Sequence, residues 1–161
     1  MHSLVLDQQL QSNNLDEKVR WREKSMEIGN ILMRDGRKVP ANQIRLGDYI
    51  EPADASVARI IDVFCSEIDV TYQITARNQK MVVVAPETVF STNQGPKRAD
   101  ELEIGDKLAM LDEEEVPVDS IKVQESENDC FFTFDLEGAK WFYLNDFVVG
   151  SVDVMYECQR K

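Results

Sequence analysis

Hydrophobic and polar positions after residue 26 alternate over short stretches and show no long helical period. The segment "DVTYQITA" alternates apolar with polar residues, and β-branched or aromatic residues dominate "CFFTFDLEG" and "KWFYLNDFVVGSVDVMY". Another apolar run, "KMVVVAP", ends at Pro86, and Asp35-Gly36 and Glu137-Gly138 are turn dipeptides. Alternation with period two between turn residues is typical of strands. The pattern therefore predicts an all-β domain.

The N-terminal part has a different pattern, since "NNLDEKVRWREKSM" at residues 13–26 is mostly polar. Asn14 is a suitable N-cap for a helix, and Glu17 completes a capping box. Leu15 and Val19 would share a thin apolar face, so this helix either leans on another surface or is a solvated appendage. The expected domains are an N-terminal helical extension over residues 1–25, a β domain over residues 26–151 and a C-terminal arm over residues 152–161.

Two segments of the β domain, "ANQIRLGDYI" from Ala41 and "ADELEIGDKL" from Ala99, follow one pattern. Each places two apolar residues before Gly-Asp, and strands of similar pattern follow in the same order. We expect a short helical turn that buries its apolar pair, then a glycine with positive φ, then a strand. The expected structural turn positions are Gly36, Gly47, Asp48, Gly105 and Asp106. The repetition predicts a duplicated β fold whose halves are related by a pseudo-two-fold axis.

The charge of the chain argues against two classes of partner. Asp and Glu number 30 against 18 Lys and Arg, which gives a net charge of -12. Such a surface repels nucleic acid and anionic membranes, because both are bound through Lys and Arg. No apolar run is long enough for a transmembrane helix, and the N-terminus does not resemble a signal peptide. We expect a protein in the cytoplasm or associated with a virion.

The three cysteines, Cys65, Cys130 and Cys158, are far apart in the sequence, and no CxxC pair is present. Zinc sites usually use close ligand pairs, so the sequence predicts no metal site and no cofactor. Buried free thiols in a reducing compartment are the expected state of these side chains. Cys65 and Cys130 fall on predicted strands, where core packing is the favoured role.

Three motifs resemble, in order, those of the Hint fold, which inteins share with the autoprocessing domains of hedgehog-type proteins. The opening "ILMRDGRKVPANQIRLGDYI" is similar to the Asp-Gly strand and I-x-x-G-D turn of that family. The middle block "VVAPETVFSTNQGPKRADELEIGDKL" resembles V-T-P-E-H-P-F followed by a second G-D turn, and "WFYLNDFVVGS" resembles the closing F-x-x-N-x-x-x-V-H-N. The resemblance covers about residues 26–151 and implies a Hint-like fold.

Hint proteins use an N-terminal Cys or Ser as nucleophile, a middle Thr and His, and in inteins a closing His-Asn. The resemblance places the nucleophile on Lys24 or Ser25, the middle pair on Ala85 and Thr88, and the closing pair on Gly150 and Ser151. Apart from Ser25, none of these side chains supplies the function that the family's chemistry needs. The only histidine is His2, in the N-terminal tail.

The resemblance and these replacements imply a catalytically inactive Hint module with a structural or docking function, for example in a bacteriophage virion or its assembly. Such a module would bind protein partners through its two terminal arms, as part of a larger assembly. Residual autoprocessing by acyl shift or cleavage at Ser25 is an alternative. A third is an acidic binding module, such as an inhibitor or DNA mimic, which the net charge of -12 alone supports.

Overall fold

The computed structural model describes residues 29–159, apart from the side chains of residues 127–129. The N-terminal helix predicted at residues 13–26 lies outside the described residues. The described strands belong to one antiparallel arrangement, in the order β2-β1-β10-β11-β6-β8-β9-β4-β3, with β5 beside β4 and β7 beside β6. The elements are β1 (Asn30–Leu32), β2 (Lys38–Pro40), η2 (Ala41–Gln43), β3 (Tyr49–Ile50), β4 (Ala58–Ala76), β5 (Met81–Val84), β6 (Val89–Thr92), β7 (Gly95–Arg98), η3 (Ala99–Glu101), β8 (Lys107–Met110), β9 (Glu113–Glu137), β10 (Trp141–Leu144), β11 (Phe147–Gly150) and α2 (Val152–Gln159). The predicted all-β fold is confirmed.

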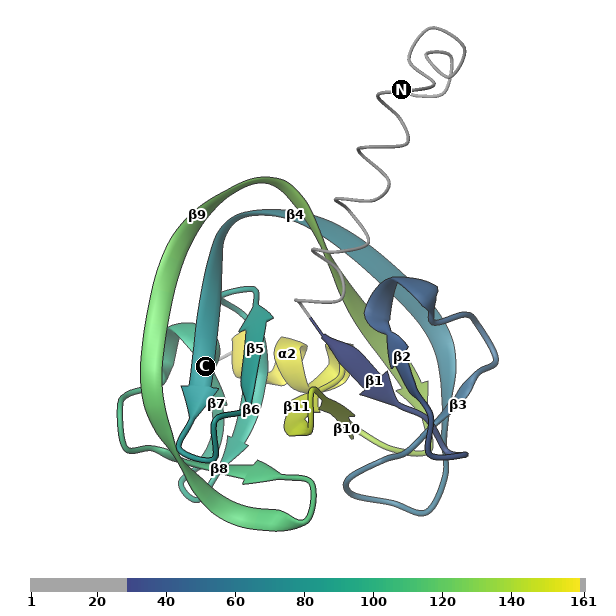
Figure 1. Ribbon diagram of the computed structural model, residues 1–161. Helices are drawn as coiled ribbons and strands as arrows, with labels where there is room; N and C mark the ends of the chain where they lie inside the picture. The colour runs from purple at the N-terminus through teal and green to yellow at the C-terminus, as the bar shows by residue number, and fades with distance from the viewer. Residues whose placement is uncertain (1–28, 160–161) are drawn as a thin grey trace, which may run out of the picture.

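The two longest strands, β4 and β9, pair antiparallel along most of their length and form an arch (Figure 1). The short strands β1, β2 and β3 lie at one end of this arch, and β5 to β8 lie at the other (Figure 1). Helix α2 lies under the arch and contacts β9, β11, β6 and β7. No helix in the described part of the chain is long and apolar enough to cross a membrane.

The predicted duplication is confirmed, because the same series of elements occurs twice. A hairpin, a 3₁₀ turn, a short strand and a long strand follow one another as β1-β2-η2-β3-β4 and again as β6-β7-η3-β8-β9. In both copies the short strand pairs with the start of the long one, β3 with β4 and β8 with β9. The long strands of the two copies then pair with each other, which joins the halves into one body.

Backbone hydrogen bonds show how each Gly-Asp turn begins its strand. Gly47 has φ +88° and donates its N–H to the carbonyl of Ile60 at 2.8 Å. Gly105 has φ +93° and donates to the carbonyl of Val118 at 2.9 Å. An L-residue rarely adopts this φ, so glycine is the residue that each turn favours. Gly36 lies in a third turn, with φ +92°.

The expectation that both apolar residues of each copy enter the core is wrong for the second one. Ile44 and Leu102 are buried, but Leu46 is 65% exposed and Ile104 is 62% exposed. The reason is a β-turn, in which Asp48 N–H donates to the carbonyl of Arg45 at 3.1 Å. Leu46 is a central residue of that turn and projects outward, and Ile104 has the equivalent place in the second copy.

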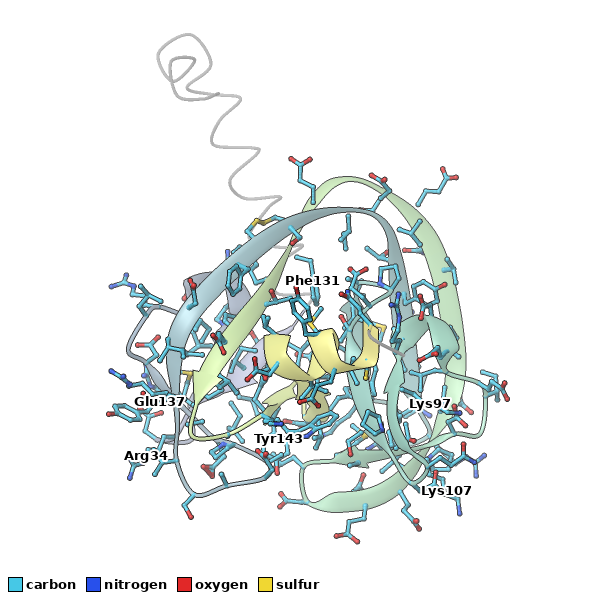
Figure 2. All side chains as sticks on the ribbon, turned by 180° about the vertical axis from the view of Figure 1, so that it is seen from behind. Arg34, Lys97, Lys107, Phe131, Glu137 and Tyr143 are labelled. Carbon is cyan, nitrogen blue, oxygen red and sulfur yellow. A yellow bond between two sulfur atoms is a disulfide. The ribbon has the colours of Figure 1, made fainter. Side chains whose placement is uncertain are left out.

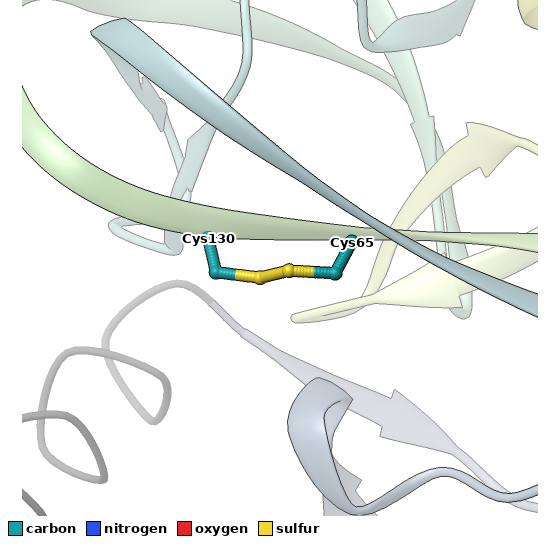
Figure 3. Close-up of a disulfide and its surroundings, with 2 residues drawn as sticks. All are labelled: Cys65 and Cys130. Atoms are coloured by element: carbon teal, nitrogen blue, oxygen red, sulfur yellow. A yellow bond between two sulfur atoms is a disulfide. The ribbon is translucent and has the colours of Figure 1, made fainter. Parts of the chain in front are cut away.

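Two further expectations are corrected at the C-terminal end and at the cysteines. The stretch from Val152 onward was expected to be strand, but it forms α2, which begins directly after Ser151. Cys65 and Cys130 are joined in a disulfide, with Cα atoms 5.7 Å apart (Figure 3), and are not buried free thiols. Pairing of β4 with β9 brings them together across 65 residues of sequence. Cys65 is exposed, whereas Cys130 and Cys158 are half-buried, and Cys158 lies outside this disulfide.

Candidate functional site

The family's catalytic positions converge in part on one pocket under the arch. Thr88, just before β6, and Gly150, the last residue of β11, both line it. Ala85 lies one turn away, because Thr88 N–H donates to its carbonyl at 3.1 Å. Ser151 follows Gly150 and is buried. Lys24 and Ser25 lie outside the described residues.

The wall of this pocket is almost entirely apolar. Its cavity is small, about 20 Å³, which is enough for a single water molecule. None of the described side chains that line it is titratable. The lining consists of Ile31, Ala41, Thr88, Phe131, Phe132, Thr133, Phe134, Phe142, Leu144, Val149, Gly150 and Met155.

Thr88 places a hydroxyl in this apolar surrounding at the position of the family's middle histidine. The residue is 3% exposed, and its Oγ1 has no hydrogen-bond partner among the described residues. A threonine hydroxyl does not titrate near neutral pH, so it cannot act as the general acid that a histidine would supply. The backbone of Thr88 does have a structural contact, since its carbonyl accepts the N–H of Ala99 at 2.7 Å.

Helix α2 occupies the space beside the closing positions. A Cβ added to Gly150 would lie 2.6 Å from the Cβ of Val154, which is a steric clash. Val154 is 3% exposed and therefore packs tightly there. Ser151 donates its N–H to the carbonyl of Lys140 at 2.8 Å, and its own carbonyl accepts the N–H of Met155 at 3.0 Å. A side chain at position 150 is thus incompatible with the packed helix.

The carboxyl group nearest in sequence to the pocket lining on β9 belongs to Asp135. Asp135 follows Phe134 and is only partly exposed. Burial raises the pKa of Asp135, and the charge of Asp153 in the first turn of α2 raises it further. Among the described residues, no group of three His, Cys, Asp or Glu side chains is arranged to hold a metal ion.

The turn between β10 and β11 forms polar contacts with distant parts of the chain, and the sequence analysis did not predict these contacts. Asn145 and Asp146 both have positive φ, 49° and 71°. The Asn145 side chain accepts the N–H of Asn30 at 2.8 Å and donates to the carbonyl of Met81 at 2.9 Å. Asn145 and Asp146 form the turn that joins Leu144 of β10 to Phe147 of β11. Its amide links β1 and β5 to the hairpin that carries Gly150.

Asp146 connects the same turn to two lysines from distant parts of the chain. Its side chain is 8% exposed and pairs with Lys38 at 3.2 Å and with Lys80. Burial alone would raise the pKa of Asp146, but the hydrogen bonds from Lys80 and Lys38 outweigh burial and lower it. Lys38 and Lys80 are 108 and 66 residues from Asp146 in the sequence, so no local pattern indicates that these cations meet it.

No protein-family model matches the sequence, and no curated protein matches it. Solved structures do. The crystal structure of the gp41-1 intein has a TM-score of 0.67 at 20% identity, over 78% of this chain and 95% of that intein. The DnaB intein from Synechocystis sp. PCC 6803 has a TM-score of 0.65 at 22% identity, over 78% and 95% of the two chains.

An intein-like domain from Clostridium thermocellum, solved in solution, has a TM-score of 0.68 at 16% identity, over 76% of this chain and 94% of that domain. These likenesses cover the β body, and they agree with the three sequence motifs and with the duplication. They establish the fold of the body. They do not establish its chemistry, which has to be argued from the residues in the pocket. The chain therefore has the Hint fold of inteins and intein-like domains.

Proposed function

We propose that this chain is a Hint-fold module that does not process itself and that has a structural or docking function. The observation that carries the proposal is the packing of Val154 against Gly150. The chain continues past the closing position as a helix that fills the place of a catalytic side chain. In this arrangement the residues around the pocket pack α2 against the sheet, and we propose that they do not catalyse peptide rearrangement.

Chemical requirements point the same way. An acyl shift needs a nucleophile, a group that donates a proton near neutral pH and, for release of the far end, an amide that can cyclise. Thr88, Gly150 and Ser151 supply neither the proton donor nor the cyclising amide. Ser25 is the remaining candidate nucleophile, and the only imidazole in the sequence is that of His2, 23 residues earlier.

The fold also supports the proposal that the chain ends make the protein contacts. Residues 1–28 lead into β1, which pairs with β10, and β10 pairs in turn with β11. The strand β11 leads directly into α2. Both chain ends therefore leave the same three-stranded part of the sheet, with β10 between them. The strand β1 begins beside the end of β10, where Ile31 pairs with Leu144, and β11 ends beside its start, where Gly150 pairs with Trp141. A larger assembly, such as a virion or its assembly apparatus, is the setting that we propose.

Intact mass spectrometry tests the absence of self-processing. The full chain is incubated with hydroxylamine or with a thiol, and a Ser25→Ala variant is the control. We expect both proteins to keep their intact mass, about 18.5 kDa, throughout. Time-dependent fragments that divide the wild-type chain between Lys24 and Ser25, and that are missing from the variant, would instead support residual autoprocessing.

The acidic binding module remains a second candidate because the net charge is -12. The two functions differ in how binding depends on salt. Exposed charges are screened over about 10 Å at 0.1 M salt, so binding through charge weakens steeply as salt increases. We expect contacts made by the arms to change little between low and high salt. A steep loss of partner binding would favour the acidic module.

A further inference from the structure

The disulfide between Cys65 and Cys130 lies where the arch has little other support. Residues 64–67 of β4 are all exposed, so few side-chain contacts hold this part of the strand. The register of the β4–β9 ladder is irregular on both sides of it, between Ile60 and Asp62 and between Ile68 and Val70. A two-stranded segment with little burial opens at low cost. The disulfide therefore fastens a short segment that packing alone holds weakly.

The fastened segment is also a wall of the pocket. Cys130 directly precedes Phe131, which lines the pocket together with Phe134. Figure 2 shows Phe131 next to α2, and that helix contacts β9. The disulfide thus ties the β9 wall, on which α2 packs, to the neighbouring strand β4.

We propose that the Cys65–Cys130 pair is a reversible thiol redox site that controls how firmly α2 closes the pocket. Cys65 is exposed, so a small thiol such as glutathione can reach its Sγ, whereas Cys130 is half-buried. Attack by the thiolate on Sγ of Cys65 breaks the S–S bond, forms a mixed disulfide and releases the Cys130 thiolate, which takes up a proton. A second thiol then releases Cys65. Two electrons pass from two small thiols, which leave as their own disulfide.

Thiol labelling under native conditions tests the accessibility of the site. Protein purified without reductant is treated with N-ethylmaleimide before and after millimolar dithiothreitol, with no denaturant, and a Cys158→Ser variant is the matched control. We expect two additional labelled thiols after reduction in both proteins. Labelling of Cys65 and Cys130 before reduction would overturn the proposal, because the bond would not form. Failure to label them until the protein is denatured would also overturn it.

Hydrogen exchange tests the effect on the pocket. On reduction, we expect peptides that contain residues 131–134 and 152–159 to exchange about tenfold faster, because the tether to β4 is lost. The turns at Gly47 and Gly105 are distant in the fold and serve as internal controls with unchanged exchange. A Cys65→Ser variant should exchange like the reduced protein with or without reductant. Equal exchange in the oxidised and reduced wild type would contradict control of the pocket.

Thermal unfolding gives a second readout that does not depend on any variant folding. A disulfide that closes a loop of this length restricts the unfolded chain, so reduction should lower Tm by about 5–10 °C. The Cys158→Ser variant should show the same shift. An unchanged Tm on complete reduction would contradict a stabilising tether. None of these results bears on self-processing, so the redox site and the proposed function succeed or fail separately.

Discussion

The two Gly-Asp turns and the pocket beside Gly150 are stabilised by opposite kinds of contact. In the turns the contacts are polar and local: Arg45 N–H donates to the Asp48 carboxylate, and Glu103 N–H to the Asp106 carboxylate, each at 2.9 Å. In the pocket they are apolar and distant in sequence, and the one buried hydroxyl lining it, on Thr88, lacks a partner within residues 29–159.

This difference separates the part of the molecule that specifies the fold from the part that would perform chemistry. Each turn has the same backbone path and the same carboxylate hydrogen bond in both copies, so the scaffold is fixed without any catalytic group. The pocket is held by side-chain packing between β9, β11 and α2. Changes in the pocket should therefore destabilise the protein through crowding or voids, and changes in the turns through backbone strain or lost charge.

The largest expected effect is that of Gly150→Ala in the pocket. The new methyl group would lie 2.6 Å from Cβ of Val154, and overpacking of a core costs roughly 1–3 kcal/mol. We expect a loss of about 2–3 kcal/mol of unfolding free energy, measured by urea denaturation. A loss below about 0.5 kcal/mol would mean that α2 does not pack on Gly150.

A double-mutant cycle sharpens this test. Val154→Ala alone should lose about 1–3 kcal/mol, because it leaves a void in a buried site. In the Gly150→Ala/Val154→Ala protein the contacts of the added methyl group with the two Cγ atoms of Val154, at 2.7 and 3.3 Å, are removed, whereas the contact at 2.6 Å with Cβ, which alanine retains, remains. The combined loss should therefore be smaller than the sum of the single losses by about 0.5–1 kcal/mol. Additive losses would show that the two side chains do not compete for the same space.

Asp146→Asn should have the next largest effect, about 1–2 kcal/mol at neutral pH, since it removes a buried carboxylate from two lysines. The effect is no larger because Lys38 and Lys80 are about half exposed, so that solvent screens their charges. Asparagine tolerates the positive φ of the turn, so the substitution tests charge and not backbone strain. Asp112→Asn is a matched control, because Asp112 also has positive φ, 62°, but is exposed.

The effect of Asp146 should depend on pH with a defined sign. Its pKa is lowered in the folded state, so its contribution is present above the unfolded pKa and is lost as pH falls through the folded pKa. The wild type's advantage over Asp146→Asn should be full at pH 7 and shrink progressively below about pH 4. Urea unfolding at several pH values measures it, and an advantage as large at pH 2 as at pH 7 would refute the ion pairs.

Gly47→Ala and Gly105→Ala should each lose about 1–2 kcal/mol, because alanine is strained at these φ values. An added Cβ meets no atom within 4 Å at either position, so strain is the only cause. The two losses should agree within about 0.5 kcal/mol by thermal or urea unfolding. Clearly unequal losses would show that the two turns are not equivalent.

The smallest expected effect is a difference between the two aspartates. Asp106 forms an ion pair with Lys97 at 3.0 Å, both side chains being largely shielded from solvent, whereas Asp48 forms none within the described part of the chain. Asp106→Asn should therefore lose about 0.5–1 kcal/mol more than Asp48→Asn, and the difference should diminish in high salt. Equal losses of unfolding free energy at low salt would show that the ion pair with Lys97 does not stabilise the second turn more than the first.

The sequence was sufficient for the parts of the fold whose partners are local. The Gly-Asp turns could be predicted because the hydrogen bond between Arg45 and Asp48 spans three residues. Exposure of Leu46 was missed because the apolar pattern does not show which residue of a turn points outward. The helix after Ser151 was missed because Val152 and Val154 favour strands, although Asp153 in the first helical turn was a contrary signal.

Long-range pairings could not be predicted in the same way. Cys65 and Cys130 meet only because β4 and β9 pair, and the register irregularities in that ladder hide which face each cysteine takes. Lys38 begins β2 and Lys80 lies in the turn between β4 and β5, and the two meet at Asp146 only in the folded chain. For the candidate site, the resemblance implied which side chains to compare, whereas only the structure showed that Val154 packs against Gly150.

The central claim is that the chain's own helix α2 closes the pocket beside Gly150. Its most direct test is a solution NMR experiment on the full chain with labelled valine methyl groups. We expect nuclear Overhauser contacts between the Val154 methyl groups and the α-protons of Gly150, together with helical chemical shifts over residues 152–159. Random-coil shifts there, without contacts to Gly150, would show that the pocket is open and would contradict the claim.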